Sequence, residues 1–183
     1  ELTKFKKYLT KLEKTTDFII LDAAPGLGKE ALFVMDASKE ILFVTAPFVP
    51  MIGDVIRCTE VLKQFGEKKM SVLLNMVTYG THELKKNVIE ELTGLPVLGE
   101  IPYDNNIMQS LVMRYPLLEY KPDSLSSINF MRIASLLTEK DYEIPMKVKW
   151  HKWFTTLRNV LLPNNIRMSD KAEDVKKELL SNF

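Results

Sequence analysis

The stretch DFIILDAAPGLGKE, residues 17–30, contains the residue types that proteins use to hold nucleotide phosphates. A glycine-rich loop ending in lysine can surround phosphate groups with backbone N–H donors. An acid at the end of an apolar strand can instead hold Mg²⁺ beside those phosphates. The stretch has a Gly-Leu-Gly-Lys run and also an apolar run that ends in Asp22, so both kinds of element are candidates.

The phosphate-loop interpretation fails at two positions. The motif G-x-x-x-x-G-K-[ST] needs a glycine five residues before Gly28 and a hydroxyl residue directly after Lys29. Ala23 and Glu30 occupy those positions. A carboxylate is a poor replacement for a hydroxyl that coordinates Mg²⁺ beside polyphosphate, and we therefore reject this interpretation.

The metal-side interpretation is the better match. Asp22 would be the acid, and Gly26 would bring a bare backbone N–H close to the terminal phosphate because no Cβ stands in the way. An ordinary structural role remains open as an alternative. In that case Asp22 caps the helix that follows or merely ends a strand, and Pro25-Gly26 is a common turn.

Apolar periodicity predicts alternating helices and strands around this stretch. Short apolar runs predict buried strands at residues 17–21, 40–46, 69–77 and 95–102. Helical spacing predicts helices over residues 1–14, 29–38, 51–65, 83–94, 106–115 and 123–138. This alternation is typical of an α/β fold in which helices flank a parallel β-sheet. Ligands of such sheets bind at the carboxyl ends of the strands, where Asp22, Asn75, Pro102 and Asp104 are expected.

Composition narrows the classes of function. The chain has 183 residues, is 46% hydrophobic and 27% charged, and carries a net charge of +1. That balance suits one globular domain with an appendage, and it makes nucleic acid an unlikely partner. The one cysteine, Cys58, excludes an internal disulfide and favours a reducing, intracellular setting. His82 and His151 have no cysteine or acidic partners at ligand spacing, so metals other than Mg²⁺ are unsupported.

Residues 147–162, KVKWHKWFTTLRNVLL, predict an amphipathic helix. Its apolar side chains fall within an arc of about 120°, and lysines and an arginine lie along the edges. This composition is typical of a helix that lies in a membrane interface. The alternative is that the stripe packs on the protein's own sheet or on a partner. The predicted membrane-facing residues are Trp150, Trp153, Phe154, Leu157 and Leu161.

Taken in order, the motifs resemble the MinD/ParA family of dimeric phosphate-loop ATPases, particularly its MinD branch. The carrying pieces are DFIILDAAPGLG, ILFVTAPFVPMIGD, SVLLNMV, LPVLGEIPYD and LLEYKPDSLSSINFMRIASLL. Their order and spacing match the C-terminal part of that domain. The resemblance implies a phosphate-loop NTPase-like fold truncated at its N-terminus over residues 1–140, followed by a helical tail over residues 141–183. It also implies ATP and Mg²⁺ as cofactors.

The resemblance implies roles for single residues. Asp22 falls on the catalytic acid that holds Mg²⁺ through water, and Gly26 on the glycine that senses the terminal phosphate. Asn75 falls on the asparagine that reads adenine, whose edge needs a donor and an acceptor together. Alternatively, Asn75 starts a loop and bonds to its own backbone. Pro102 and Asp104 fall on the loop that encloses the base.

Some positions depart from the family pattern. The first proline of Asp-x-Pro-Ala-Gly or Asp-x-Pro-Pro-Gly is missing, and Ala46-Pro47-Phe48 replaces the Asn-Pro-Glu of MinD. The family's phosphate loop would lie upstream of Glu1. We therefore expect ATP hydrolysis only from a longer, full-length protein, and not from this chain alone.

The expected function is an ATP-dependent dimerising switch for spatial positioning, at a division site, a cell pole or a flagellum. The resemblance implies a homodimer in the ATP-bound state, with Asp54 near the dimer and partner surface, and an activating protein as a further partner. A cytoplasmic protein that attaches peripherally to the inner face of the cell membrane would suit the tail. Two alternatives remain open: a degenerate, non-catalytic interaction module, and a ParA-like DNA-partitioning ATPase.

Overall fold

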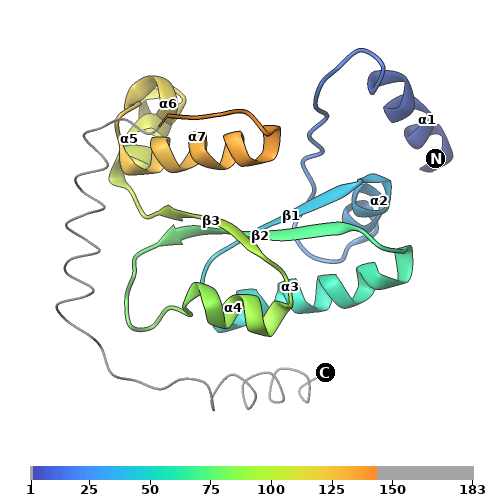
Figure 1. The fold of residues 1–183 in the computed structure, drawn as a ribbon, viewed down its shortest axis with the longest axis horizontal. Helices are drawn as coiled ribbons and strands as arrows, with labels where there is room; N and C mark the ends of the chain where they lie inside the picture. Colours follow the sequence, from blue (N-terminus) through green and yellow to red (C-terminus); the bar gives the residue numbers. More distant parts are fainter. Residues whose placement is uncertain (1, 144–183) are drawn as a thin grey trace.

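The computed structural model describes residues 2–143, and the fold below concerns these residues (Figure 1). The predicted tail helix at 147–162, with its five membrane-facing residues, lies outside them. A three-stranded sheet forms the centre. It consists of β1 (Glu40–Thr45), β2 (Lys69–Val77) and β3 (Val97–Pro102) in the order β1-β2-β3. All pairs are parallel, with Phe43 opposite Val72 and Val72 opposite Val97. The predicted fold class, a parallel sheet flanked by helices, is confirmed.

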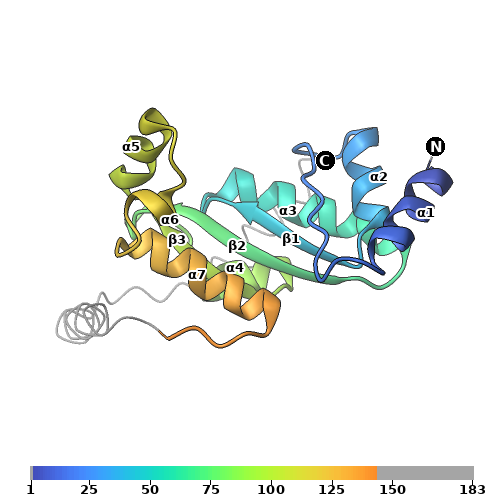
Figure 2. The same cartoon turned by 90° about the horizontal axis from the view of Figure 1, so that it is seen from above.

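The helices lie on both faces of this sheet (Figures 1 and 2). The crossover helices α3 (Val49–Leu62), continued by the short helix η1 (Lys63–Phe65), and α4 (Lys86–Thr93) cover one face. On the other face α7 (Leu125–Thr138) packs along β3. Helices α5 (Asn105–Met113) and α6 (Leu117–Tyr120) stand at the carboxyl end of the strands, and α1 (Leu2–Leu12) and α2 (Lys29–Ala37) precede the sheet.

Each face of the sheet has its own core. The larger core lies between the sheet and the crossover helices, and its side chains include Phe43, Ile52, Leu62, Val72 and Ile89. The smaller core joins Leu73, Ile101 and Ile133 under α7. Burial of apolar surface on both faces explains why the strands read as continuous apolar runs and not as alternating ones.

A β-bulge in β3 decides which side chains enter which core. Val72 pairs with Val97, but the next residue of β2, Leu73, pairs with Gly99, so Leu98 is an extra residue. The bulge reverses the alternation of β3, because one inserted residue turns the following side chains to the opposite face. Val97 therefore joins the larger core, whereas Gly99 and Ile101 face α7.

Most predicted elements are confirmed within a few residues. The strand predicted at 69–77 has those bounds, and α4 ends at Gly94, whose φ of +67° is a left-handed conformation that glycine adopts without strain. Ser124 caps α7 by accepting a hydrogen bond from the backbone N–H of Ser127. The four-residue helix α6 was not predicted, since it is too short to show a period.

The predicted strand at residues 17–21 is wrong for this structure. The segment forms no sheet ladder, and Ile20 is 91% exposed while Phe18 is 54% exposed. A strand exists only where a neighbour satisfies its backbone N–H and C=O groups. Among residues 2–143, β1 is an edge strand and the 17–21 segment is not paired to it. An apolar run predicts the tendency to be buried, but not the presence of a neighbour.

The approach of α7 to β3 gives a stability prediction. A Cβ added at Gly99 would lie 2.9 Å from Ile133 Cγ1, closer than two carbon atoms pack. We expect Gly99→Ala to lower the free energy of unfolding by about 1–3 kcal/mol, the range for overpacked cores. Urea unfolding followed by circular dichroism measures the change. In an Ile133→Ala background the clash is absent, and an undiminished cost of Gly99→Ala there would contradict the explanation.

Candidate functional site

The loops after β1, β2 and β3 meet at the carboxyl edge of the sheet. The backbone N–H of Leu84, in the loop after β2, donates to the carbonyl of Pro47 after β1 at 2.8 Å. The backbone N–H of Tyr103, after β3, donates to the carbonyl of Val77 at 2.9 Å. These two bonds fix the three loops to one another. The edge is therefore built in advance of any ligand.

Asn75 lies at a second β-bulge, near the end of β2. Leu74 pairs with Glu100 and Val77 with Pro102, so β2 has one residue more than β3 over this interval. Met76 has a φ of +56°, which is rare for a residue with a side chain. The Oδ1 atom of Asn75 accepts the backbone N–H of Met76 at 2.9 Å, and this is the self-bonded state of the alternative interpretation. The amide nitrogen donates to no group among residues 2–143.

Pro102 ends β3 and Asp104 lies in the loop that follows, next to the start of α7. Ser126 is fully buried, and its hydroxyl donates to the carbonyl of Pro102 at 3.1 Å. Asp104 caps α5, with Oδ1 accepting the backbone N–H of Asn106 at 2.8 Å and its Nδ2 at 2.6 Å. Burial raises the pKa of Asp104, but the bonds from Asn106, Ser126 and Ser124 outweigh it and leave the pKa below its ordinary value.

Asp104 therefore has a structural role that the sequence could have revealed. An aspartate directly before an apolar helical run is a common N-cap signal. The structure brings Asn75, Pro102 and Asp104 to one edge, as predicted, because Val77 pairs with Pro102 across neighbouring strands. The carboxylate of Asp104 is held by the first turn of α5 and by serines at the start of α7.

Glu83 is a residue of the edge that sequence reasoning missed. Its Oε1 accepts the backbone N–H and the hydroxyl of Thr78, both at 2.8 Å, and this closes the loop that follows β2. Burial raises the pKa of Glu83, but those two bonds and the backbone N–H groups of Tyr79 and Gly80 outweigh it, so the pKa is lowered. The Oε2 atom is buried without a partner among residues 2–143. No sequence motif marks this loop.

Tyr79 links the same loop to β3. Its hydroxyl hydrogen-bonds to Glu100. Partial desolvation of the ring hydroxyl, together with the charges of Glu100 and Glu83, raises the pKa of Tyr79 to about 12. Tyr79 also has a φ of +60°, so two residues of this edge, Met76 and Tyr79, have left-handed backbone. Such conformations cluster at functional sites because the surrounding structure must hold them.

Asp22 and Gly26 lie elsewhere in this structure. They belong to the segment that links α1 to α2, and in both views this segment lies along the molecule toward α1 and away from α5 (Figures 1 and 2). Asp22 is exposed, and it makes no hydrogen bond or ion pair with the part of the chain described. Gly26 has a φ of +85° with no atom within 4 Å of an added Cβ. The predicted crevice shared with Asn75 is not formed here.

Two further predicted residues lie on α3. Asp54 is exposed and forms an ion pair with Arg57, one turn along the helix. Cys58 is buried, and burial raises the pKa of its thiol although the charge of Arg57 opposes the shift. A thiol with a raised pKa is a poor nucleophile at neutral pH, so the structure supports a packing role for Cys58.

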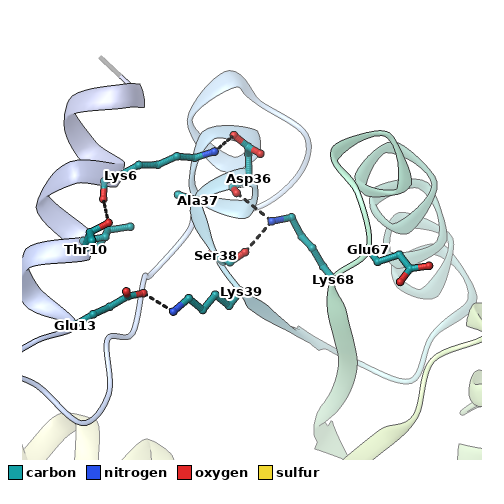
Figure 3. Close-up of a pocket in the computed structure, with 10 residues that line it drawn as sticks. Lys6, Thr10, Glu13, Asp36, Ala37, Ser38, Lys39, Glu67 and Lys68 are labelled. Carbon is teal, nitrogen blue, oxygen red and sulfur yellow. Dashed lines mark hydrogen bonds and ion pairs between the residues drawn. The ribbon is translucent and has the colours of Figure 1, made fainter.

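In a charged hollow at the opposite end of the strands, most of the charged side chains are paired with other residues of the hollow (Figure 3). Lys6 pairs with Asp36 at 2.8 Å, and Lys39 pairs with Glu13 at 2.7 Å. Lys68 donates to the carbonyls of Asp36 and Ser38, at the carboxyl end of α2, where a cation is favoured. These contacts fasten α1, α2 and the start of β2 together.

Comparison with known proteins identifies the family. The ParA family model, described as NUBPL iron-transfer P-loop NTPase, matches residues 4–138. The chain therefore belongs to the ParA family of P-loop NTPases. An ATP-binding protein of Methanocaldococcus jannaschii is 27% identical over 146 residues, which cover 80% of this chain and 55% of that protein. A chloroplastic MinD homologue of Arabidopsis thaliana is 29% identical over 136 residues, covering 72% of this chain and 42% of that protein.

Solved structures give the same relationship. The cell division ATPase MinD of Pyrococcus furiosus has a TM-score of 0.68 at 26% identity, covering 76% of this chain and 59% of that one. MinD of Pyrococcus horikoshii, solved with Mg-ADP, has a TM-score of 0.67 at 25% identity, covering 75% and 56%. The resemblance to the MinD/ParA family is confirmed. The chain spans about half the length of the curated relatives it matches.

Residues 2–143 contain neither a helix that could span a membrane nor a cluster of metal-binding side chains. Within residues 2–143, none of the helices combines the length and the apolar character that a bilayer crossing requires. The same residues contain no group of three or more histidine, cysteine, aspartate or glutamate side chains placed to hold a metal ion.

The Glu83 contacts give a prediction that depends on pH. Glu83→Gln should lower the free energy of unfolding at pH 7 by about 1 kcal/mol, because the carboxylate's bonds to Thr78 become weaker. Since the folded pKa lies below the unfolded value of about 4.3, this stabilisation is present above that pH. It disappears as the pH falls through the folded pKa. Urea unfolding at pH 7 and pH 3 measures it. The control Glu91→Gln, on the exposed side of α4, should change nothing, and an equal loss at both pH values would contradict the account.

Proposed function

We propose that the chain is the C-terminal portion of a MinD-like ATPase and that the carboxyl edge of its sheet binds the base of ATP. The observation that carries this proposal is the bulge at Asn75. Asn75 lies two residues before Val77, which pairs with Pro102, and directly before Met76, whose backbone is held in a rare conformation.

The chemistry of Asn75 suits adenine. The base presents a donor and an acceptor side by side, and an amide side chain offers the complementary pair. The amide nitrogen already has no partner within the described residues, and Oδ1 needs only to exchange its bond to the Met76 N–H for the adenine amino group. Pro102 contributes an apolar surface, and the Ser126 bond to its carbonyl keeps that surface in place.

The residues on the phosphate side fit Mg²⁺ and triphosphate only in part. Mg²⁺ keeps several waters and uses one or two carboxylates together with substrate phosphates, so Asp22, exposed and unpaired among residues 2–143, suits an outer position. Gly26 has an open backbone that a phosphate could approach. When bound, the metal would neutralise charge on the phosphates, while Asp22 would orient one of its waters. For this to happen, the segment that contains Asp22 and Gly26 must first move to the carboxyl edge of the sheet.

That rearrangement has a physical driving force. Residues 18–21 are apolar, Phe18 and Ile20 among them are exposed, and burying a side chain such as Ile20 is worth about 1.5–3 kcal/mol. A parallel strand formed by these residues would end at Asp22. The acid would then lie at the edge that carries Asn75, in the arrangement that the family resemblance implies.

We extend the proposal to a dimerising switch for spatial positioning. The carboxylate of Asp54 is 62% exposed on α3, which leaves it accessible to a second copy or to an activating protein. A structure of Aquifex aeolicus MinD includes its partner MinC, and its likeness to this chain, at 16% identity and a TM-score of 0.71, supports the common fold.

ATP hydrolysis by the complete polypeptide that contains this sequence tests the proposal. Asp22→Asn should lower kcat about 10- to 100-fold, the usual effect of losing a group that orients a metal-bound water. Asn75→Ala should weaken ATP binding by about 1–3 kcal/mol and reduce discrimination against GTP. The matched controls are Asp17→Asn, on the same exposed segment, and Asn87→Ala on the exposed side of α4, and both should leave kcat and KM unchanged.

The complete coding sequence gives a second test of the ATPase proposal. A glycine-rich loop followed by Lys-Thr supports the ATPase. If the complete polypeptide lacks such a loop and binds no ATP, the chain is the non-catalytic interaction module that the sequence left open. If the complete polypeptide binds DNA, this result would favour the DNA-partitioning alternative.

Membrane attachment through residues 147–162 is part of the same proposal. Two weak amphipathic helices in a dimer bind a surface bivalently, so ATP-driven dimerisation would control attachment. Pelleting of the chain with anionic vesicles tests this. We expect binding that falls when Trp153→Ser and Phe154→Ser are introduced together, with Thr155→Ser and Thr156→Ser as the matched control on the polar side. No binding of the unaltered chain to anionic vesicles would remove the membrane part of the proposal.

A further inference from the structure

The segment from Asn75 to Tyr79 keeps an unfavourable backbone at an exposed place. Met76 and Tyr79 have φ values of +56° and +60°, in the left-handed region that a side chain disfavours. Met76 is 50% exposed and Tyr79 is 66% exposed. Burial in the core therefore does not explain why these two residues keep this conformation. Contacts from outside the segment must hold it, and two side-chain contacts are available.

The first contact comes from Glu83. Its Oε1 atom accepts the backbone N–H and the hydroxyl of Thr78, both at 2.8 Å. Two further backbone N–H groups of the same loop also stabilise the carboxylate. Glu83 is itself fixed in place, because the next residue, Leu84, donates its backbone N–H to the carbonyl of Pro47 at 2.8 Å. The carboxylate therefore ties Thr78 to the loop that follows β1.

The second contact comes from Glu100 in β3. The hydroxyl of Tyr79 donates a hydrogen bond to its carboxylate. Glu100 is paired with Leu74, the residue directly before Asn75, so this bond joins the two ends of the segment across the bulge. We call the two contacts, Glu83 with Thr78 and Glu100 with Tyr79, the loop clamp.

From these contacts we infer that Glu83 and Tyr79 are positioning residues for recognition of the base, which act by holding Asn75 in the orientation that adenine requires. The inference rests on the proposed binding of ATP at this edge. In this structure Oδ1 of Asn75 accepts the backbone N–H of Met76 at 2.9 Å. When that oxygen turns to the adenine amino group, the bond is lost, and the left-handed backbone at Met76 loses its local support. The loop clamp then remains to hold it.

A positioning role has a defined signature in binding and catalysis. A segment that is ordered before the nucleotide arrives loses less conformational freedom on binding. Without the clamp, Asn75 has the required orientation for only a fraction of the time, and the apparent affinity for ATP falls by that fraction. The residues proposed for the phosphate side, Asp22 and Gly26, lie on a different segment. The clamp should therefore affect nucleotide affinity and base preference, and not the rate of hydrolysis at saturating ATP.

Nucleotide binding by the complete polypeptide tests the inference. Glu83→Gln, Tyr79→Phe and Thr78→Val each weaken or remove one bond of the clamp. Each should raise the Kd for ATP about three- to tenfold, the usual effect of a hydrogen bond to a charged group, and should reduce the preference for ATP over GTP. Kcat at saturating ATP should stay within about a factor of two, since the phosphate side is unaltered. Equilibrium titration gives the Kd values, and steady-state hydrolysis gives kcat.

Three matched controls should leave ATP binding unchanged. Thr78→Ser keeps both the N–H and the hydroxyl that Glu83 accepts. Glu91→Gln on α4 and Tyr8→Phe on α1 make the same chemical changes at exposed positions away from the clamp. Urea unfolding checks that every variant is folded under the conditions of the titration. If Glu83→Gln is not, Tyr79→Phe and Thr78→Val still carry the test, because each removes one hydroxyl from an exposed residue.

A double-mutant cycle shows whether the clamp acts through Asn75. Residues that act as one unit have non-additive effects. In an Asn75→Ala background no amide remains to be oriented, so Glu83→Gln and Tyr79→Phe should change the Kd for ATP less than about twofold. If either variant weakens ATP binding by the same factor in both backgrounds, it acts on binding without Asn75, and the inference is wrong for that residue.

Backbone dynamics give a readout that needs no nucleotide. In the complete polypeptide without ATP, we expect nitrogen-15 order parameters of about 0.85 at Met76 and Tyr79, the value of a rigid backbone, and values below about 0.6 in Glu83→Gln. If they stay at about 0.85, the clamp does not hold the segment and the inference is overturned.

The results also separate this inference from the proposed function. If Asn75→Ala weakens ATP binding but the clamp variants do not, the base proposal stands and the positioning role alone is wrong. If Asn75→Ala leaves the affinity for ATP unchanged, binding of the base at this edge is wrong, and the positioning role fails with it.

Discussion

The central strand β2 is the element on which the other parts of the structure depend, because it is hydrogen-bonded to a parallel neighbour along both of its edges. A parallel pair cannot be joined by a tight turn, so each connection must cross the sheet through a helix. Both crossover helices, α3 and α4, therefore pack on the same face and bury one continuous core. The loops after the strands are then forced to one edge, where the candidate site lies.

The two bulges show how small changes of register create that site. The extra residue at Leu98 turns Gly99 toward α7, and the close contact with Ile133 brings this helix and its buried serines to the end of β3. The extra residue near Asn75 ends the regular pairing of β2 and turns the backbone at Met76 into a left-handed conformation. Glu83 then holds the following loop by its bonds to Thr78. The two bulges and the Glu83 contacts thus follow one another along the edge, and each holds the segment beside it.

Two apolar surfaces remain exposed, and they differ in origin. Residues 18–21 have the composition of an inner strand but no hydrogen-bonded neighbour within residues 2–143, so the exposure of Phe18 and Ile20 reflects missing backbone partners. Helix α5 is complete and capped, and the exposure of Leu111 and Val112 reflects missing side-chain partners within residues 2–143. The first surface can be satisfied only by an adjacent strand. The second requires only apolar side chains of suitable shape.

The sequence by itself determined the fold class and most of the order of the elements, because apolar periods and strand-end residues are local signals. The resemblance of its ordered motifs to a known family indicated the family. It also determined that Asn75, Pro102 and Asp104 share one edge, since parallel strands align their carboxyl ends. Only the tertiary structure decided that residues 17–21 lie outside the sheet and away from Asn75. The tertiary structure alone also decided that Glu83 closes the loop after β2 and that α5 stays largely exposed within residues 2–143. Pairing, bulges and coverage depend on neighbours distant in the chain, and no local pattern of residues encodes them.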